Sequence, residues 1–274
     1  MEPNQRQRMA EFAMASFLNG QYYESVCSTA ALVYMAEQLR SHERHLMCDI
    51  FLGIINKFII EKNELEKQLE TKRQALQQIS EPTEEQKEVV EAAKEGINIL
   101  LWHLTMYISK MLGITIEALN SFTTDDHEPK VFLFRLMGEC LGIMCQLVNP
   151  DDDVVNTAAS TAYAFGVVYG FHLPPTHPSN LENIISYCIF AVRNLRNLDA
   201  AIQLASYAMS ICTEEMILES SHVQATRHRL HLLQLCLDVW TTIREIMNSN
   251  SNTDTDTDTD TNEDAASEAP NADA

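Results

Sequence analysis

The chain has 274 residues, enough for one large domain, and its eight Gly and eight Pro argue against a loop-rich or all-β protein. Its formal net charge of −20 makes nucleic acid and anionic membranes poor partners. No run of 18 apolar residues occurs and the N-terminus, "MEPNQRQRMAEF", has no apolar signal core, so we expect neither a membrane span nor export.

Apolar residues recur at helical spacing along most of the chain, and no alternating strand pattern is present. We therefore predict an all-α fold of about nine helices, antiparallel because most connections are short. The aspartates of "NPDDD" suit a helix N-terminus, where they satisfy unpaired backbone N–H groups. The predicted helices span 4–18, 21–37, 41–77, 85–111, 128–147, 151–171, 178–194, 198–215 and 219–247.

Two segments depart from this compact pattern. The second half of the third helix, "EKNELEKQLETKRQALQQ", has few apolar residues, so we expect it to project past the core. Residues 249–274 contain eight Asp and Glu, no Lys or Arg, and a repeated Thr-Asp pair. We therefore divide the chain into a helical domain, 1–248, and an acidic, low-complexity tail, 249–274, that we expect to be disordered.

The cysteines and histidines give no sign of a disulfide framework or of an enzyme. Seven Cys are scattered through apolar helical stretches without a C-x-x-C, which predicts reduced thiols and a cytoplasmic protein. The H-x-x-H pairs His42/His45 and His228/His231 could bind a metal from one helical face, but no third ligand accompanies either pair. We predict solvated or capping histidines, no cofactor and no catalytic residue. A metal-dependent enzyme remains the alternative from a different class.

Three segments together resemble the 14-3-3 family. They are "PKVFLFRLMGE" at 129–139, "LPPTHPSNLENIISYCIFAVRNL" at 173–195, with the P-T-H-P helix start, and "LHLLQLCLDVW" at 230–240, which ends at the family's Trp. A weaker match covers "SHERHLMCDIFLGIINKFI" at 41–59. Their order, the chain length, the helix number and the acidic tail agree with that family over roughly residues 5–245. A tetratricopeptide-like scaffold is the rival fold, but no 34-residue period runs through the chain.

The resemblance implies a cup-shaped dimer whose groove holds a phosphoserine or phosphothreonine peptide, with the phosphate bound by a Lys, two Arg and a Tyr. In this chain those four positions correspond to Leu52, Ile59, Gly142 and Ile143. The helix "KVFLFRLMGECLGIMCQLV" accordingly carries two glycines, each costing roughly 1 kcal/mol relative to Ala in a helix interior. Gly138 matches the family's own Gly, whereas Gly142 replaces an Arg. The phosphate site is therefore predicted to be degenerate.

The rest of the groove that the resemblance implies is only partly kept. Its apolar residues remain, two peptide-holding Asn become Ser186 and Cys236, the groove Lys becomes Arg135, and the groove Glu becomes Arg193. We expect an adaptor that binds protein partners largely independently of phosphorylation. The alternative is a signalling regulator that still binds phosphorylated or acidic motifs through a shifted basic cluster, Arg135, Arg193 and Arg229. The predicted groove comprises Arg135, Ile185, Ser186, Ile189, Arg193, Leu232, Cys236, Val239 and Trp240.

Assembly follows from the same resemblance. The first helix, "AEFAMASFL", presents Phe12, Ala13, Ala15 and Phe17, and the resemblance places such a helix at a dimer interface. An apolar stripe of this kind would otherwise stay open to water. We expect a homodimer, and the resemblance also allows a heterodimer with another 14-3-3 protein.

Overall fold

The computed structural model describes residues 3–36, 38–148 and 152–253, and within them the chain is all-helical. The first five helices are α1 (Pro3–Leu18), α2 (Tyr22–Met35), α3 (Ser41–Gln77), α4 (Glu84–Asn120) and α5 (His127–Val148). The next five are α6 (Asp153–Gly170), α7 (Pro178–Arg193), α8 (Leu198–Ser210), α9 (Glu214–Glu219) and α10 (Val223–Thr253). The predicted all-α fold is confirmed.

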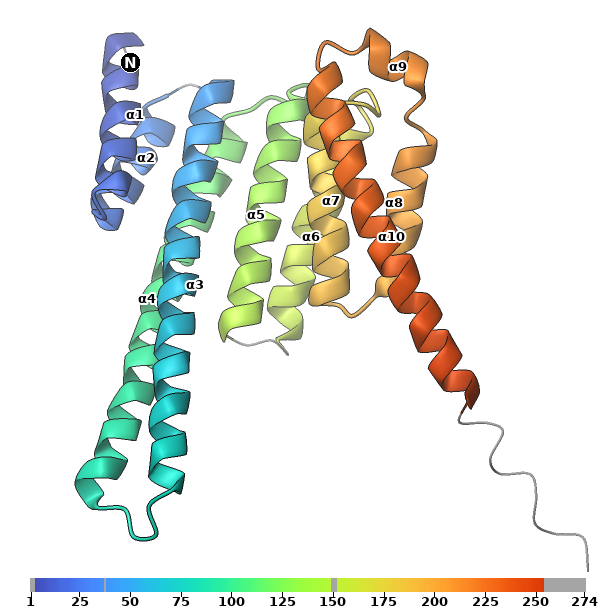
Figure 1. Cartoon of the computed structure of the whole chain (residues 1–274). Helices are drawn as coiled ribbons and strands as arrows, with labels where there is room; N and C mark the ends of the chain where they lie inside the picture. The colour runs from blue at the N-terminus through green and yellow to red at the C-terminus, as the bar shows by residue number, and fades with distance from the viewer. Residues whose placement is uncertain (1–2, 37, 149–151, 254–274) are drawn as a thin grey trace, which may run out of the picture.

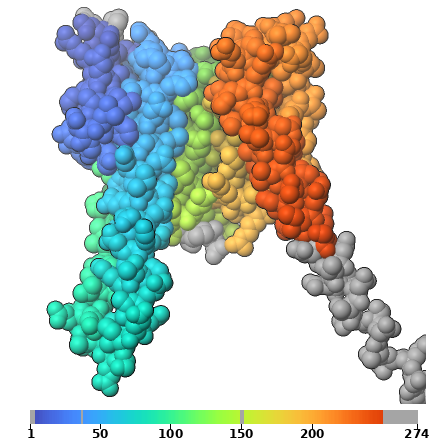
Figure 2. All heavy atoms as spheres, in the orientation of Figure 1, coloured from blue at the N-terminus to red at the C-terminus, as the bar shows by residue number. Residues whose placement is uncertain are grey.

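The helices stand side by side in chain order, and α10 crosses α7 and α8 obliquely (Figure 1). The main core lies between α1 and α5, where side chains such as Phe51, Ile108 and Leu136 are fully buried. A second core joins α7, α8 and α10 around Cys188, Leu233 and Trp240. The space-filling view shows the two ends of the molecule separated by the narrower α5–α6 region (Figure 2).

Several helix starts follow from local chemistry. Thr83 and Gln86 form a reciprocal capping box at the start of α4. The Asp152 carboxylate accepts hydrogen bonds from the N–H groups of Val154 and Val155, so the prediction that these aspartates begin a helix is confirmed. At α7, Pro178 occupies the first turn, where its missing N–H costs nothing, and the His177 ring caps the helix.

The second half of α3 projects beyond the other helices, as predicted, and it does so as a hairpin with the first half of α4 (Figure 1). Its free end is held by a small cluster in which Leu69, Val90 and Ile97 are buried. By length and composition alone, α4 and α5 could each cross a bilayer. Both nevertheless supply buried residues to the main core, as the core helices of soluble proteins do.

Three predicted boundaries were wrong. The fourth helix continues from 111 to Asn120, because its added turns bury Ile114, Thr115 and Ala118. Gly113, within these turns, has no neighbouring atom within 4 Å of the place of a Cβ. The eighth helix ends at Ser210, and the Thr213 hydroxyl caps a separate short helix, α9, so the described residues contain ten helices instead of nine. The last helix extends to Thr253, so the predicted tail is helical over 249–253, and residues 254–274 lie outside the described residues.

Candidate ligand groove

A pocket of about 210 Å³ lies between the second half of α5 and α7. It brings together five of the predicted residues, Gly142 and Ile143 from α5 and Ser186, Ile189 and Arg193 from α7. The remaining wall is mostly apolar or amide-bearing, and is formed by Glu139, Gln146, Tyr163, Phe190 and Asn194. Positions far apart in the sequence, which only the resemblance linked, therefore form one surface.

Gly142 contributes no side chain to this pocket, although its α5 neighbours Glu139, Ile143 and Gln146 do. A Cβ at this position would lie 3.0 Å from Cδ2 of Phe190, so even Ala is a tight fit. The Gly142 carbonyl accepts a hydrogen bond from the Asn194 amide at 3.1 Å, and the Asn194 oxygen accepts one from Gln146 at 2.7 Å. Neutral amides therefore bond to the backbone beside the position that the resemblance gives to an Arg.

Leu52 and Ile59 do not line the pocket. Both side chains lie on α3, where they are half-buried and pack against the main core, as Ile143 also does. Asn56 and Lys57, between them in sequence, are exposed. The structure therefore joins three of the four predicted phosphate-site positions to the apolar core.

The opposite wall of the predicted groove is apolar but unevenly exposed. Ile185, Ile189 and Cys236 are half-buried against the second core. Leu232 and Val239 on α10 are 38% and 57% exposed. Trp240 is only 7% exposed and belongs to that core, so its ring supports the wall from behind instead of forming its surface.

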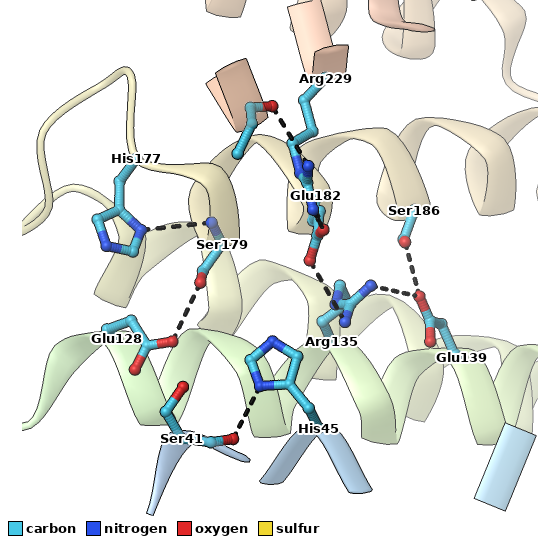
Figure 3. Close-up of polar contacts among 11 residues, drawn as sticks. Ser41, His45, Glu128, Arg135, Glu139, His177, Ser179, Glu182, Ser186 and Arg229 are labelled. Carbon is cyan, nitrogen blue, oxygen red and sulfur yellow. Dashed lines mark hydrogen bonds and ion pairs between the residues drawn. The ribbon is translucent and has the colours of Figure 1, made fainter. Parts of the chain in front are cut away.

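Two of the three predicted basic residues are neutralised within the protein (Figure 3). Arg135 lies 3.3 Å from Glu139 and 3.5 Å from Glu182. Arg229 forms a forked interaction with the same Glu182, in which its Nε donates at 2.9 Å. The Ser186 hydroxyl donates to Glu139 at 2.8 Å. Four charged side chains from α5, α7 and α10 thus form one ion-pair network: Arg135, Glu139, Glu182 and Arg229.

Burial disfavours the charged form of Arg135, but the carboxylates of Glu139 and Glu182 more than offset this effect and raise its pKa. Arg135 is therefore a fixed cation whose charge is already balanced. Sequence reasoning missed Glu182, which joins Arg135 to Arg229. A usable signal was present, because Glu182 and Ser186 are four residues apart and share one face of α7.

Arg193 is outside this network. Its side chain is exposed and, in the part of the chain that the structure describes, forms no ion pair. Burial raises the pKa of the nearby Cys236 thiol, and the positive charge of Arg193 acts in the opposite direction. The three arginines of the predicted shifted cluster therefore do not act as one free basic patch.

The histidine pairs lie on the surface, and His45 makes a contact within its own helix. His42, His45, His228 and His231 are all exposed. The His45 Nδ1 interacts with the Ser41 carbonyl oxygen at 2.8 Å, and its ring lies 5.0 Å from that of Phe132. Across residues 3–36, 38–148 and 152–253, no three His, Cys, Asp or Glu side chains are grouped as metal ligands. No disulfide bond joins any of the seven cysteines.

Comparison with known proteins agrees with this architecture. A family model described as "14-3-3 protein" matches residues 13–241. A protein from Encephalitozoon cuniculi (strain GB-M1) described as "14-3-3 protein homolog" is 23% identical over 161 residues. That match covers 57% of this chain and 62% of the relative, so it spans less than two thirds of the relative's length.

Proposed function

The chain belongs to the 14-3-3 family of non-enzymatic adaptor proteins, and from this premise we propose that it binds protein partners largely without a phosphate. One observation carries the proposal: Leu52, Ile59, Gly142 and Ile143 occupy the four positions at which the family is expected to hold the phosphate. None of them can donate a side-chain hydrogen bond. Burying a phosphate against them would cost several kcal/mol of uncompensated desolvation.

The surroundings of the pocket support the same proposal. Arg135 and Arg229 are already paired with Glu139 and Glu182, so an incoming anion would compete with carboxylates that are held in place. Arg193 alone would leave a phosphate with one charged contact. The apolar side chains of Ile143 and Ile189, at the 210 Å³ pocket, instead suit an apolar anchor of a partner peptide.

A titration tests the proposal directly. A standard phosphoserine peptide of the kind that the family binds, and its unphosphorylated twin, should both bind at micromolar affinity or weaker. The phosphate should improve binding by less than tenfold, which corresponds to about 1.4 kcal/mol. A larger preference would show that the phosphate site still works.

A reciprocal variant serves as the control for that titration. Combining Leu52→Lys, Ile59→Arg, Gly142→Arg and Ile143→Tyr should create a clear preference for the phosphorylated peptide. Circular dichroism must show intact helicity, because the long side chain introduced at position 142 has to displace the Phe190 ring. A folded variant that still ignores the phosphate would show that the four positions are not the ones that matter.

We further propose a dimer formed through the outer face of α1, α2 and α4. Phe12, Tyr23, Trp102 and Met106 are each more than half exposed, and a hollow of about 350 Å³ lies beside Tyr23 and Trp102. Two residues of the predicted first-helix stripe do not belong to this outer face. Ala13 is fully buried and Phe17 packs over Gly53, so both contact their own protomer.

Light scattering tests the dimer. The measured mass should be about twice 31.0 kDa, and Trp102→Glu should halve that mass.

The cytoplasm is the proposed location. Seven cysteines without a disulfide bond among them support it, because disulfides are rare there. Burial raises the pKa of the Cys48 and Cys188 thiols to about 12, so both stay protonated at neutral pH.

A further inference from the structure

The last helix, α10, has two apolar faces. One face packs on the bundle through Leu233 and Trp240, which are 0% and 7% exposed. A helix on a protein surface usually has one apolar stripe and a polar outer face. The second apolar face of α10 is open to solvent, so it needs a separate explanation.

The open face is a regular stripe. At 100° per residue, its members fall within about 120° of one another around the helix axis. Leu232, Val239 and Ile246 are seven residues apart, and Cys236 and Ile243 are also seven apart, which is the spacing of a helix–helix seam. We call this set the α10 stripe; it comprises Leu232, Leu235, Cys236, Val239, Ile243, Ile246 and Met247, of which only Cys236 is half-buried.

The C-terminal part of the stripe lies beyond the bundle. Arg244 pairs with Asp199 at the start of α8 at 3.7 Å, and after this contact α10 continues past the ends of α7 and α8 (Figure 1). Ile246 and Met247 are 53% and 62% exposed there. Figure 2 shows this end of α10 standing clear of the other helices.

The sequence after the stripe indicates its partner. Residues 254–274 carry eight Asp and Glu, no Lys or Arg, and no Leu, Ile, Val, Met or aromatic residue. That segment therefore has no large apolar side chain with which to cover the stripe itself. A second copy of the stripe would double the negative charge at the contact, which opposes self-pairing.

We propose that the α10 stripe binds an amphipathic α-helix of a partner protein whose polar face is basic. The apolar side of that helix covers Val239, Ile243 and Ile246 in a seam of heptad type, and the positive charge of its Lys or Arg residues complements the eight acids that the sequence carries after residue 253. This inference goes beyond the proposed function, although the α10 stripe and the predicted groove have three residues in common, Leu232, Cys236 and Val239. Ile243, Ile246 and Met247 lie outside the predicted groove, so the two can fail separately.

The test uses the full-length protein and a labelled 18-residue peptide of Leu and Lys, with Leu at heptad a and d positions. Two matched peptides accompany it: a scramble of the same composition, and a version in which Glu replaces Lys. Fluorescence anisotropy should show binding of the amphipathic basic peptide only. Deleting residues 254–274 should weaken that binding and reduce its dependence on salt.

A matched pair of variants locates the contact. Ile246→Asp should weaken binding by about tenfold. Val168→Asp on α6 should not, although Val168 and Ile246 are equally exposed at 53%. The phosphopeptide comparison should be the same in both variants and in the wild type.

Four results would overturn the proposal. The scrambled peptide could bind equally well, which would show that net charge alone causes the binding. Ile246→Asp could bind the peptide as well as Val168→Asp does, which would show that the stripe is not the contact. Light scattering could show that Ile246→Asp halves the mass, which would make a second copy the occupant. Alternatively, the protein could bind phosphatidylcholine vesicles and lose that binding on Ile246→Asp, which would make the stripe a membrane contact.

Discussion

The two halves of α5 differ in what faces them. Around Gly138 the helix is closely packed, because a Cβ at this position would lie 2.7 Å from the Tyr163 ring. The charged residues nearby, Arg135 and Glu139, are paired with each other in the ion-pair network. One turn later, Gly142 borders the open pocket, and only the edge of Phe190 limits a Cβ. The surroundings of Gly138 therefore leave no room for a side chain, whereas those of Gly142 leave a little.

The two glycines give the sharpest test of this difference. Gly138→Ala should lower the free energy of unfolding by about 2 kcal/mol, since overpacking against Tyr163 outweighs the roughly 1 kcal/mol gained in helix propensity. Gly142→Ala should change it by less than about 1 kcal/mol, since Phe190 needs to move only slightly. Urea unfolding of both variants measures this. Equal losses at both positions would show that Gly142 is also required by packing.

The charge network should respond next most strongly. Glu182→Gln leaves Arg229 without its carboxylate and Arg135 with Glu139 alone. Because Glu182 is 25% exposed, the cost should be about 1 to 2 kcal/mol, below that of breaking a fully buried pair. Glu214→Gln is the matched control, because Glu214 and Arg227 form a surface pair, and it should cost less than about 0.5 kcal/mol.

Glu182→Gln also tests the rival function. It frees the guanidinium group of Arg229 and leaves Arg135 with one carboxylate instead of two, so phosphopeptide affinity should rise above that of the wild type, while Glu214→Gln leaves it unchanged. If Glu182→Gln does not strengthen phosphopeptide binding, neutralisation of Arg135 and Arg229 is not what limits anion binding in this groove.

Helical periodicity and capping residues predicted the fold class and most helices. The failures were at helix boundaries, and after residue 111 the cause is tertiary burial, because the helix continues through the buried Ile114 and Thr115. For the candidate site, the replacement of the four phosphate-site positions could be found from the resemblance. The spacing of Glu182 and Ser186 could place Glu182 on the groove face of α7, but its pairing with Arg135 and Arg229 could not be predicted, because that depends on three helices meeting in space.

The smallest expected effect concerns the start of α7, which is tied to the first half of α5. The His177 ring accepts a hydrogen bond from the Ser179 N–H at 3.3 Å, and the Ser179 hydroxyl donates to Glu128 at 3.1 Å. Burial lowers the pKa of His177 below 6.5, and His222, 5.6 Å away, acts in the same direction, while Glu128 opposes them. His177 is therefore neutral in the folded protein at pH values where the unfolded chain already takes up a proton.

Stability should consequently fall as the pH decreases through about 6.5, because protonation is favoured in the unfolded state and removes the acceptor that caps α7. His177→Asn keeps a capping acceptor but does not titrate. Between pH 7.5 and 5.5 this variant should lose about 0.5 kcal/mol less than the wild type, as measured by thermal unfolding. His228→Asn, at an exposed position of α10, should behave like the wild type. If His177→Asn loses as much stability on acidification as the wild type, the pH response arises at another group.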